Sequence, residues 1–166
     1  MAKLYPVNSK RILSTVVTFW FTIAVLGQWI FASYVLWFYG RATVTGHTEN
    51  WNKVLPHGYV PGDFTGNIVV GLHLVLTIFI LIAGPIQIIP GVRKAFPLLH
   101  RWTGRIYILI AFAMSISGLF MVWVRGSVGG VTQHISISVN AVLIMVSAMF
   151  TVKYARAGDM IRHRIW

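Results

Sequence analysis

Four long runs of uncharged, mostly apolar residues dominate the sequence, and short polar segments separate them. The runs cover residues 12–40, 64–92, 106–124 and 126–152. Each has about the length, roughly 20 residues, that an α-helix needs to cross the hydrocarbon layer of a bilayer. Only 10% of the residues are charged, against roughly 25% in soluble domains. The pattern predicts an all-α protein, a polytopic transmembrane helix bundle in which each helix satisfies its own backbone polar groups.

We expect one integral membrane domain over residues 1–166, with spans at about 12–39, 66–90, 97–124 and 129–153 and an outer loop at 41–63. The third span is extended back to Pro97, because the residues that follow continue an amphipathic pattern without a helix breaker. Residues 162–166 are basic and aromatic, which is typical of a membrane interface in front of a helix. The four spans are therefore expected to be followed by a fifth that begins at the C-terminus.

The distribution of lysine and arginine predicts the orientation. With the N-terminus inside, three basic residues lie outside: Arg41, Lys53 and Arg125. Eleven lie inside: Lys3, Lys10, Arg11, Arg93, Lys94, Arg101, Arg105, Lys153, Arg156, Arg162 and Arg164. Basic loops stay on the cytoplasmic side of a membrane, so the N-terminus is expected in the cytoplasm. The net charge of +11 comes from these topology signals, so we expect lipid and no nucleic acid as a partner.

The lack of cysteine and the lack of acidic residues within the spans exclude several kinds of catalytic and binding site. The chain has no cysteine, which excludes disulfides, thiol catalysis, iron–sulfur ligation and covalent haem attachment. Its three acidic residues, Glu49, Asp63 and Asp159, all lie outside the spans. Paired-carboxylate catalysis and ion-coupled transport are therefore not expected.

Four of the six histidines lie near the ends of the apolar runs. His73 and His134 are expected near the outer ends of the second and fourth spans, and His100 and His163 on the inner side. An imidazole within lipid is costly, so such histidines are functional candidates. The alternation suggests two level pairs, His73 with His134 and His100 with His163, and paired axial histidines are what the iron of a b-type haem needs. We expect the other two histidines, His47 and His57, to be solvated in the outer loop.

Two further features support a haem site, and each has an ordinary alternative. Small residues share a face of the third helix with His100, namely Gly104, Ala111, Ser115 and Gly118, and leave room for a macrocycle, although small residues also serve ordinary helix packing. Arg101 and Arg105 flank His100 and suit haem propionates, although such arginines also contact anionic lipid.

Gln87 is a lone polar residue between two prolines at the end of the second run. It could bind the headgroup of a quinone. The alternative is that it satisfies backbone groups freed by the prolines.

Several segments resemble a bacterial membrane family catalogued as domain of unknown function 2306. They are G-P-I-Q at 84–87, L-H-R-W-T-G-R-I-Y at 99–107, G-D at 158–159 and H-R-I-W at 163–166. The resemblance covers roughly residues 64–166 and implies the inner (cytoplasmic) membrane of a bacterium and a further helix after the last segment. It implies no activity, and His134 lies outside its pattern.

The order of the histidines is similar to that of cytochrome b561 at the level of topology. In that family, histidines of the second and fourth helices and of the third and fifth helices hold two haems. The analogy predicts a di-haem b-type membrane cytochrome that carries electrons across the bilayer, from an inner donor such as a quinol to an outer acceptor. The alternative is a non-catalytic accessory subunit of a larger membrane complex, which contacts lipid, quinone or partner helices.

Overall fold

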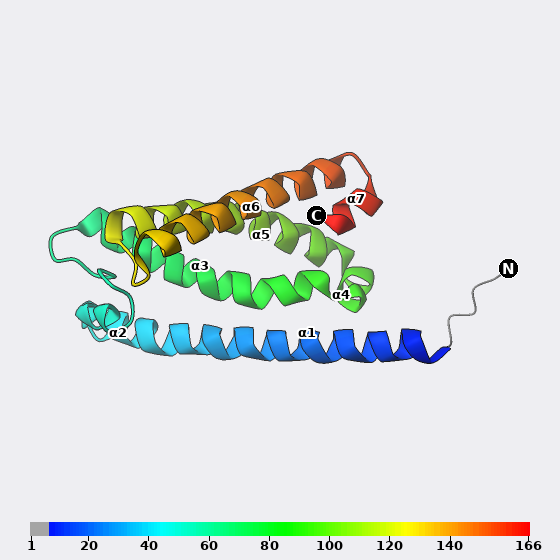
Figure 1. Ribbon diagram of the computed structural model, residues 1–166, viewed down its shortest axis with the longest axis horizontal. Coiled ribbons are helices and arrows are strands. Elements are labelled where there is room, and N and C mark those ends of the chain that lie inside the picture. The colour runs from blue at the N-terminus through cyan, green and yellow to red at the C-terminus, as the bar shows by residue number, and fades with distance from the viewer. Residues whose placement is uncertain (1–6) are drawn as a thin grey trace.

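The computed structural model describes residues 7–166, and within them the chain is helical and contains no strand (Figure 1). The predicted basic residue Lys3 lies outside the described residues. In chain order the elements are α1 (Val7–Val35), η1 (Leu36–Gly40), α2 (Arg41–Val44), η2 (Thr48–Lys53), α3 (Phe64–Ile88), α4 (Pro90–Ala95), α5 (Pro97–Phe120), η3 (Met121–Arg125), α6 (Gly130–Arg156) and α7 (Met160–Ile165). Four helical stretches are long and apolar enough to cross a membrane: Ser9–Val44, Phe64–Ile88, Pro97–Arg125 and Gly130–Arg156. This confirms the predicted all-α class with four spans.

Local sequence signals set the helix ends. The first helix continues through the π-helical segment η1 to Val44, further than the expected loop start, and ends before Gly46, which has a φ of +74° that favours glycine. α3 begins after Asp63, whose carboxylate accepts the Gly66 backbone N–H as an N-cap. α5 begins at Pro97, since a proline in the first turn forgoes no helical hydrogen bond.

Helix α5 is the centre of the bundle. It packs against both α3 and α6, while α3 and α6 make no comparable contact with each other. α1 packs against α3, as its position beside α3 in Figure 1 shows. Large apolar side chains remain exposed on the outward faces, for example Leu109 and Ile116 of α5, which suits contact with lipid. Thus α3 and α6 occupy opposite sides of α5.

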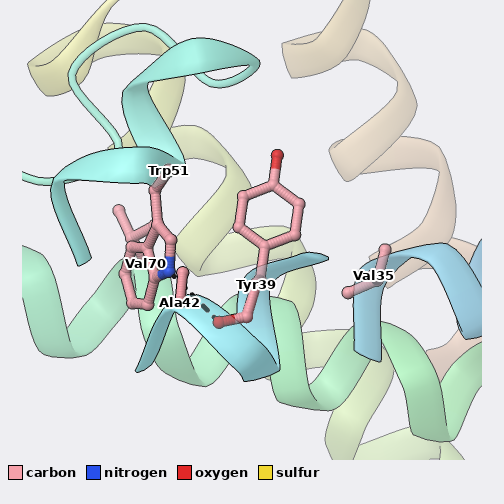
Figure 2. Packing of buried hydrophobic residues seen from close by; sticks show 5 residues of the cluster. All are labelled: Val35, Tyr39, Ala42, Trp51 and Val70. Carbon is pink, nitrogen blue, oxygen red and sulfur yellow. Dashed lines mark hydrogen bonds between the residues drawn. The ribbon is translucent and has the colours of Figure 1, made fainter. Parts of the chain in front are cut away.

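A hydrophobic cluster closes the end of the bundle that carries residues 45–63 (Figure 2). We call this end the outer end and the opposite end the inner end, after the predicted orientation. It consists of Val35, Tyr39, Ala42, Trp51 and Val70, and Val70 is fully buried. The indole Nε1 of Trp51 donates a hydrogen bond to the backbone carbonyl of Tyr39 at 3.4 Å, and the two rings meet edge to face. Because Trp51 belongs to η2, the cluster fixes the outer loop to the first and second spans.

The inner end carries the two short helices α4 and α7 (Figure 1). α7 folds back against α6. The ring of Trp166 stacks on that of Phe150 with centroids 4.6 Å apart, and the guanidinium of Arg162 lies over the ring of Tyr154. This contact brings the last histidine of the chain back to the bundle.

Candidate functional site

The antiparallel helices place the four candidate histidines toward two opposite ends of the bundle. His73 lies about 13 Å along α3 and His134 about 6 Å along α6, at 1.5 Å per residue, and both helices start at the outer end (Figure 1). His100 is in the first turn of α5, and His163 is in α7, at the inner end.

His73 is held by a hydroxyl of the neighbouring helix. Its Nδ1 lies 2.8 Å from the Oγ of Ser117 on α5. The same hydroxyl lies 2.7 Å from the backbone carbonyl of Ala113, and when it donates its hydrogen there, its oxygen accepts from Nδ1, which carries the proton. The Nε2 of His73 then bears a free lone pair. Gly118 adjoins the ring, because a Cβ there would lie 3.6 Å from its Cε1.

His163 has the same arrangement. Its Nδ1 donates to the backbone carbonyl of Thr151 at 3.1 Å, because a carbonyl oxygen can only accept. Nε2 is again left with its lone pair. The carboxylate of Asp159 caps α7 by accepting the Arg162 backbone N–H at 3.0 Å, which fixes the short helix that carries the ring.

His134 and His100 each bury a ring nitrogen without a hydrogen-bond partner among the described residues. These atoms are the Nε2 of His134 and the Nδ1 of His100. The ring of His134 packs edge-on against Trp123, with centroids 5.2 Å apart. Unpaired buried polar atoms are rare in native proteins, and the Nε of Arg125 and the Oγ of Ser127 share this property among the described residues.

The structure places the members of each expected pair on different helices. His100 lies in the first turn of α5 and His163 in α7, both at the inner end. His73 and His134 belong to helices on opposite sides of α5, and within residues 7–166 no direct interaction joins their rings. The same residues contain no group of three or more histidine and acidic side chains that could hold a metal ion. A bis-histidine haem site takes only two ligands from the protein and therefore falls below that number.

The motif glycines accommodate the chain's own polar side chains. A Cβ at Gly104 would lie 3.3 Å from the Oε1 of Gln87, and a Cβ at Gly84 would lie 3.4 Å from the ring of Tyr107. The Nε2 of Gln87 donates to the hydroxyl of Thr103. These two glycines therefore serve helix packing between α3 and α5.

The two arginines expected beside a haem lie at the surface. Arg101 is exposed. The guanidinium of Arg105, also exposed, lies 5.1 Å from the centre of the Trp102 ring. Both positions suit a membrane interface and leave the guanidinium groups accessible to an anionic partner.

A polar cluster at the outer end, which we call the outer clamp, was not predicted from the sequence. It comprises Arg125, Asp63, His57 and Asn67. The buried guanidinium of Arg125 pairs with the carboxylate of Asp63 at 2.9 Å and donates to the His57 backbone carbonyl at 2.9 Å and to the Asn67 Oδ1 at 3.1 Å. In return, the Nδ1 of His57 donates to the Arg125 carbonyl at 2.9 Å.

The outer clamp also explains an unusual backbone conformation. His57, exposed as expected, has a φ of +51°, which is rare for a residue other than glycine, and its two hydrogen bonds to Arg125 hold it there. Arg125 ends the π-helical segment η3, and such segments are frequent at constrained sites. The sequence does contain an indication of the ion pair, since Asp63 and Arg125 lie next to the outer ends of two apolar runs that are expected to be antiparallel.

Comparison with known proteins gives one match. A family model described as predicted membrane protein (DUF2306) matches residues 70–166. The matched segment contains α5, α6, α7 and most of α3, with all four candidate histidines. No curated protein and no solved structure matches the chain.

Proposed function

We propose that this chain, which belongs to the DUF2306 family of predicted membrane proteins, is a b-type haem protein that carries electrons across the bilayer. His73 and His134 would serve an outer haem, and His100 and His163 an inner one. The donor would be a quinol or another reductant on the inner side. The location we propose is the inner membrane of a bacterium, with the N-terminus in the cytoplasm.

The observation that carries the proposal is the shared arrangement of His73 and His163. In both, Nδ1–H is held by an oxygen, and Nε2 keeps its lone pair. Metal-binding histidines have this arrangement, because the outer hydrogen bond fixes the tautomer and the orientation of the ring. The unpaired buried nitrogens of His134 and His100 supply the second members of the two pairs.

The surrounding residues fit such a group by position and charge. When bound, haem supplies a one-electron change at its iron. Ser117 and the Thr151 carbonyl orient the rings of His73 and His163, and the apolar spans exclude water. The exposed Arg101 and Arg105 are available for propionates. Because α5 lies between α3 and α6, an outer haem held by both His73 and His134 would require α3 or α6 to shift relative to α5.

A visible spectrum of the purified protein tests the proposal. We expect a Soret band and, after dithionite reduction, a sharp α band. His73→Ala and His163→Ala should each remove about half of the haem. Each variant deletes one of the two axial ligands of one haem and leaves the other haem intact. His47→Ala, in the outer loop, is the matched control and should keep the full spectrum. Protein from haem-replete cells that has no reducible Soret band would rule the proposal out.

Ser117 is a positioning residue for His73, and its role has a separate readout. Ser117→Ala should keep the haem but raise the midpoint potential of one haem, because a hydrogen bond to Nδ1 increases the basicity of the ligand. Ser117→Thr should restore the potential, since it keeps a hydroxyl. An unchanged potential in Ser117→Ala would show that the contact only packs the helices.

The alternative function is that of a non-catalytic accessory subunit that contacts lipid, quinone or partner helices. It is favoured by the packing of Gly84 and Gly104 against the chain's own side chains, which leaves these glycines no further role. This function predicts colourless protein that copurifies with a larger complex.

A further inference from the structure

One face of α6 that does not pack on α5 carries a polar stripe. Its members are Thr132, Ser136, Asn140 and Ser147, at spacings of four, four and seven residues along the helix, which place them on one face. The first three are exposed and Ser147 is half-buried, whereas Ala141 and Ala148, on the other side of the helix, are buried. Asn140 lies about 15 Å from the start of α6, which is near the middle of a hydrocarbon layer about 30 Å thick.

Three members of this stripe, Thr132, Asn140 and Ser147, have no side-chain hydrogen bond among residues 7–166, and Asn140 has the most polar groups of the three. Its side chain is exposed, and it makes no hydrogen bond within residues 7–166. The hydroxyl of Ser136, by contrast, donates to the Thr132 carbonyl at 2.9 Å. A carboxamide has two N–H donors and one acceptor, and leaving them unpaired in hydrocarbon is strongly unfavourable. This face of α6 therefore needs a partner that both donates and accepts.

Toward the inner end of α6, the same face is covered by α7. Trp166 stacks on Phe150, and His163 binds the Thr151 carbonyl. The open part runs from Thr132 to Ser147, a length of about 23 Å or roughly four turns. That length suits one helix packed alongside α6.

We propose that this face binds a second copy of the chain, in a two-fold symmetric dimer with the two α6 helices parallel. Two copies inserted in the same orientation are related by an axis along the membrane normal, so a residue facing the axis meets itself at the same depth. Asn140 would then meet Asn140 of the partner subunit. Two carboxamides can exchange N–H···O=C hydrogen bonds, and the small residues Thr132 and Ser136 at four-residue spacing allow the helices to approach closely.

A second exposed carboxamide provides the contrast. Gln28 of α1 is also exposed and without a hydrogen bond in the described chain. Its neighbours on the same helix face are all apolar, namely Ala24, Val25, Phe31 and Ala32. It therefore lacks the neighbouring polar residues that distinguish the α6 stripe, which makes it the control.

Single-cysteine variants test the interface directly, because the chain has no cysteine of its own. Ser136→Cys and Leu143→Cys place a thiol on the stripe one turn before and after Asn140, and oxidation in native membranes should give a crosslinked dimer. Val142→Cys is the control, since Val142 is exposed like its neighbour Leu143 but lies about 100° round the helix. Equal crosslinking from Val142→Cys, or none from the two stripe variants, would overturn the proposal.

The role of the carboxamide is tested by counting subunits by photobleaching in lipid vesicles. The wild-type chain should be dimeric at high protein density, and Asn140→Leu should weaken dimerisation on the order of tenfold, as loss of interhelical hydrogen bonds does in membranes. Gln28→Leu should leave the dimer unchanged. A monomeric wild type, or a dimer that Asn140→Leu leaves intact, would contradict the proposal. The crosslinking variants keep Asn140, so their result stands if Asn140→Leu fails to fold.

Discussion

The two ends of the bundle place their arginines differently. At the outer end the buried guanidinium of Arg125 binds three partners, and Trp51 is buried beneath the loop. At the inner end the basic residues lie mostly at the surface, as Arg101 and Arg105 do. Buried polar atoms without a partner in the described part of the chain occur at both ends. The outer end is thus held by a buried ion pair, whereas the arginines of the inner end are exposed.

The contrast follows from whether the arginines at each end are buried or exposed. A buried guanidinium is tolerated only when it is paired, because its desolvation is costly. The hydrogen bonds of Arg125 therefore tie the loop to the start of α3 and the end of η3. Surface arginines need no such pairing, and they suit anionic lipid. Under the proposed function, a donor would reach the inner end without moving the chain, whereas the loop would restrict access from outside.

The largest expected effect comes from filling the space beside the clamp. A Cβ at Gly66 would overlap the Arg125 guanidinium and the Asp63 carboxylate. Gly66→Ala should therefore lower the free energy of unfolding by about 3 kcal/mol, through overpacking and loss of a buried ion pair. Thermal unfolding in detergent measures the change. Gly71→Ala is the matched control on the same helix, because its Cβ would make an ordinary contact of 3.4 Å with Trp51. Equal losses in the two variants would contradict the assignment of the clamp.

Removing the guanidinium should have the next largest effect. Arg125→Met should cost about 2 kcal/mol, less than for a fully buried pair, because the side chain of Asp63 is 42% exposed and can be hydrated. Arg125→Lys should recover little, since a lysine cannot bridge several acceptors in a fixed geometry. Limited proteolysis of residues 45–63 reports the release of the loop. The inner-end control, Arg105→Met, should change stability by under about 0.5 kcal/mol, and a larger loss there would remove the contrast between the ends.

The sequence predicted the large features because each has a strong local cause. Four apolar runs require four helices, and Pro97 marks the start of α5. The outer clamp was missed because Arg125 lies 58 to 68 positions from its partners, and only tertiary packing brings them together. The hydrogen bonds of His73 and His163 were beyond prediction for the same reason, since helix rotation decides which side chains meet. The pairing of the histidines with haem stays a prediction.

A smaller effect is expected at the inner end, where one carboxylate holds α7. Asp159→Ala removes the N-cap bond to the Arg162 N–H and an exposed ion pair at 3.6 Å. Loss of such a cap costs about 1 kcal/mol, so hydrogen exchange of the α7 amides should accelerate about fivefold. Asp159→Asn keeps a capping oxygen and loses only the charge, and should behave almost like the wild type. If Asp159→Ala lowered the free energy of unfolding of the whole bundle as much as Gly66→Ala does, the inner end would contribute as much to stability as the outer end.

The smallest expected effect is a pH dependence of the outer loop. Hydrogen bonds from its own backbone amide and from the side chain of His47 lower the pKa of Glu49. A carboxylate whose pKa is lowered by folding stabilises the fold above its unfolded pKa, and this contribution is lost as the pH falls through the lowered folded value. Because Glu49 is exposed, solvent screens the effect, and it should appear only as faster proteolysis of η2 in acid. Glu49→Gln should abolish the dependence. Proteolysis of η2 that depends on acid as strongly in Glu49→Gln as in the wild type would contradict this role of Glu49.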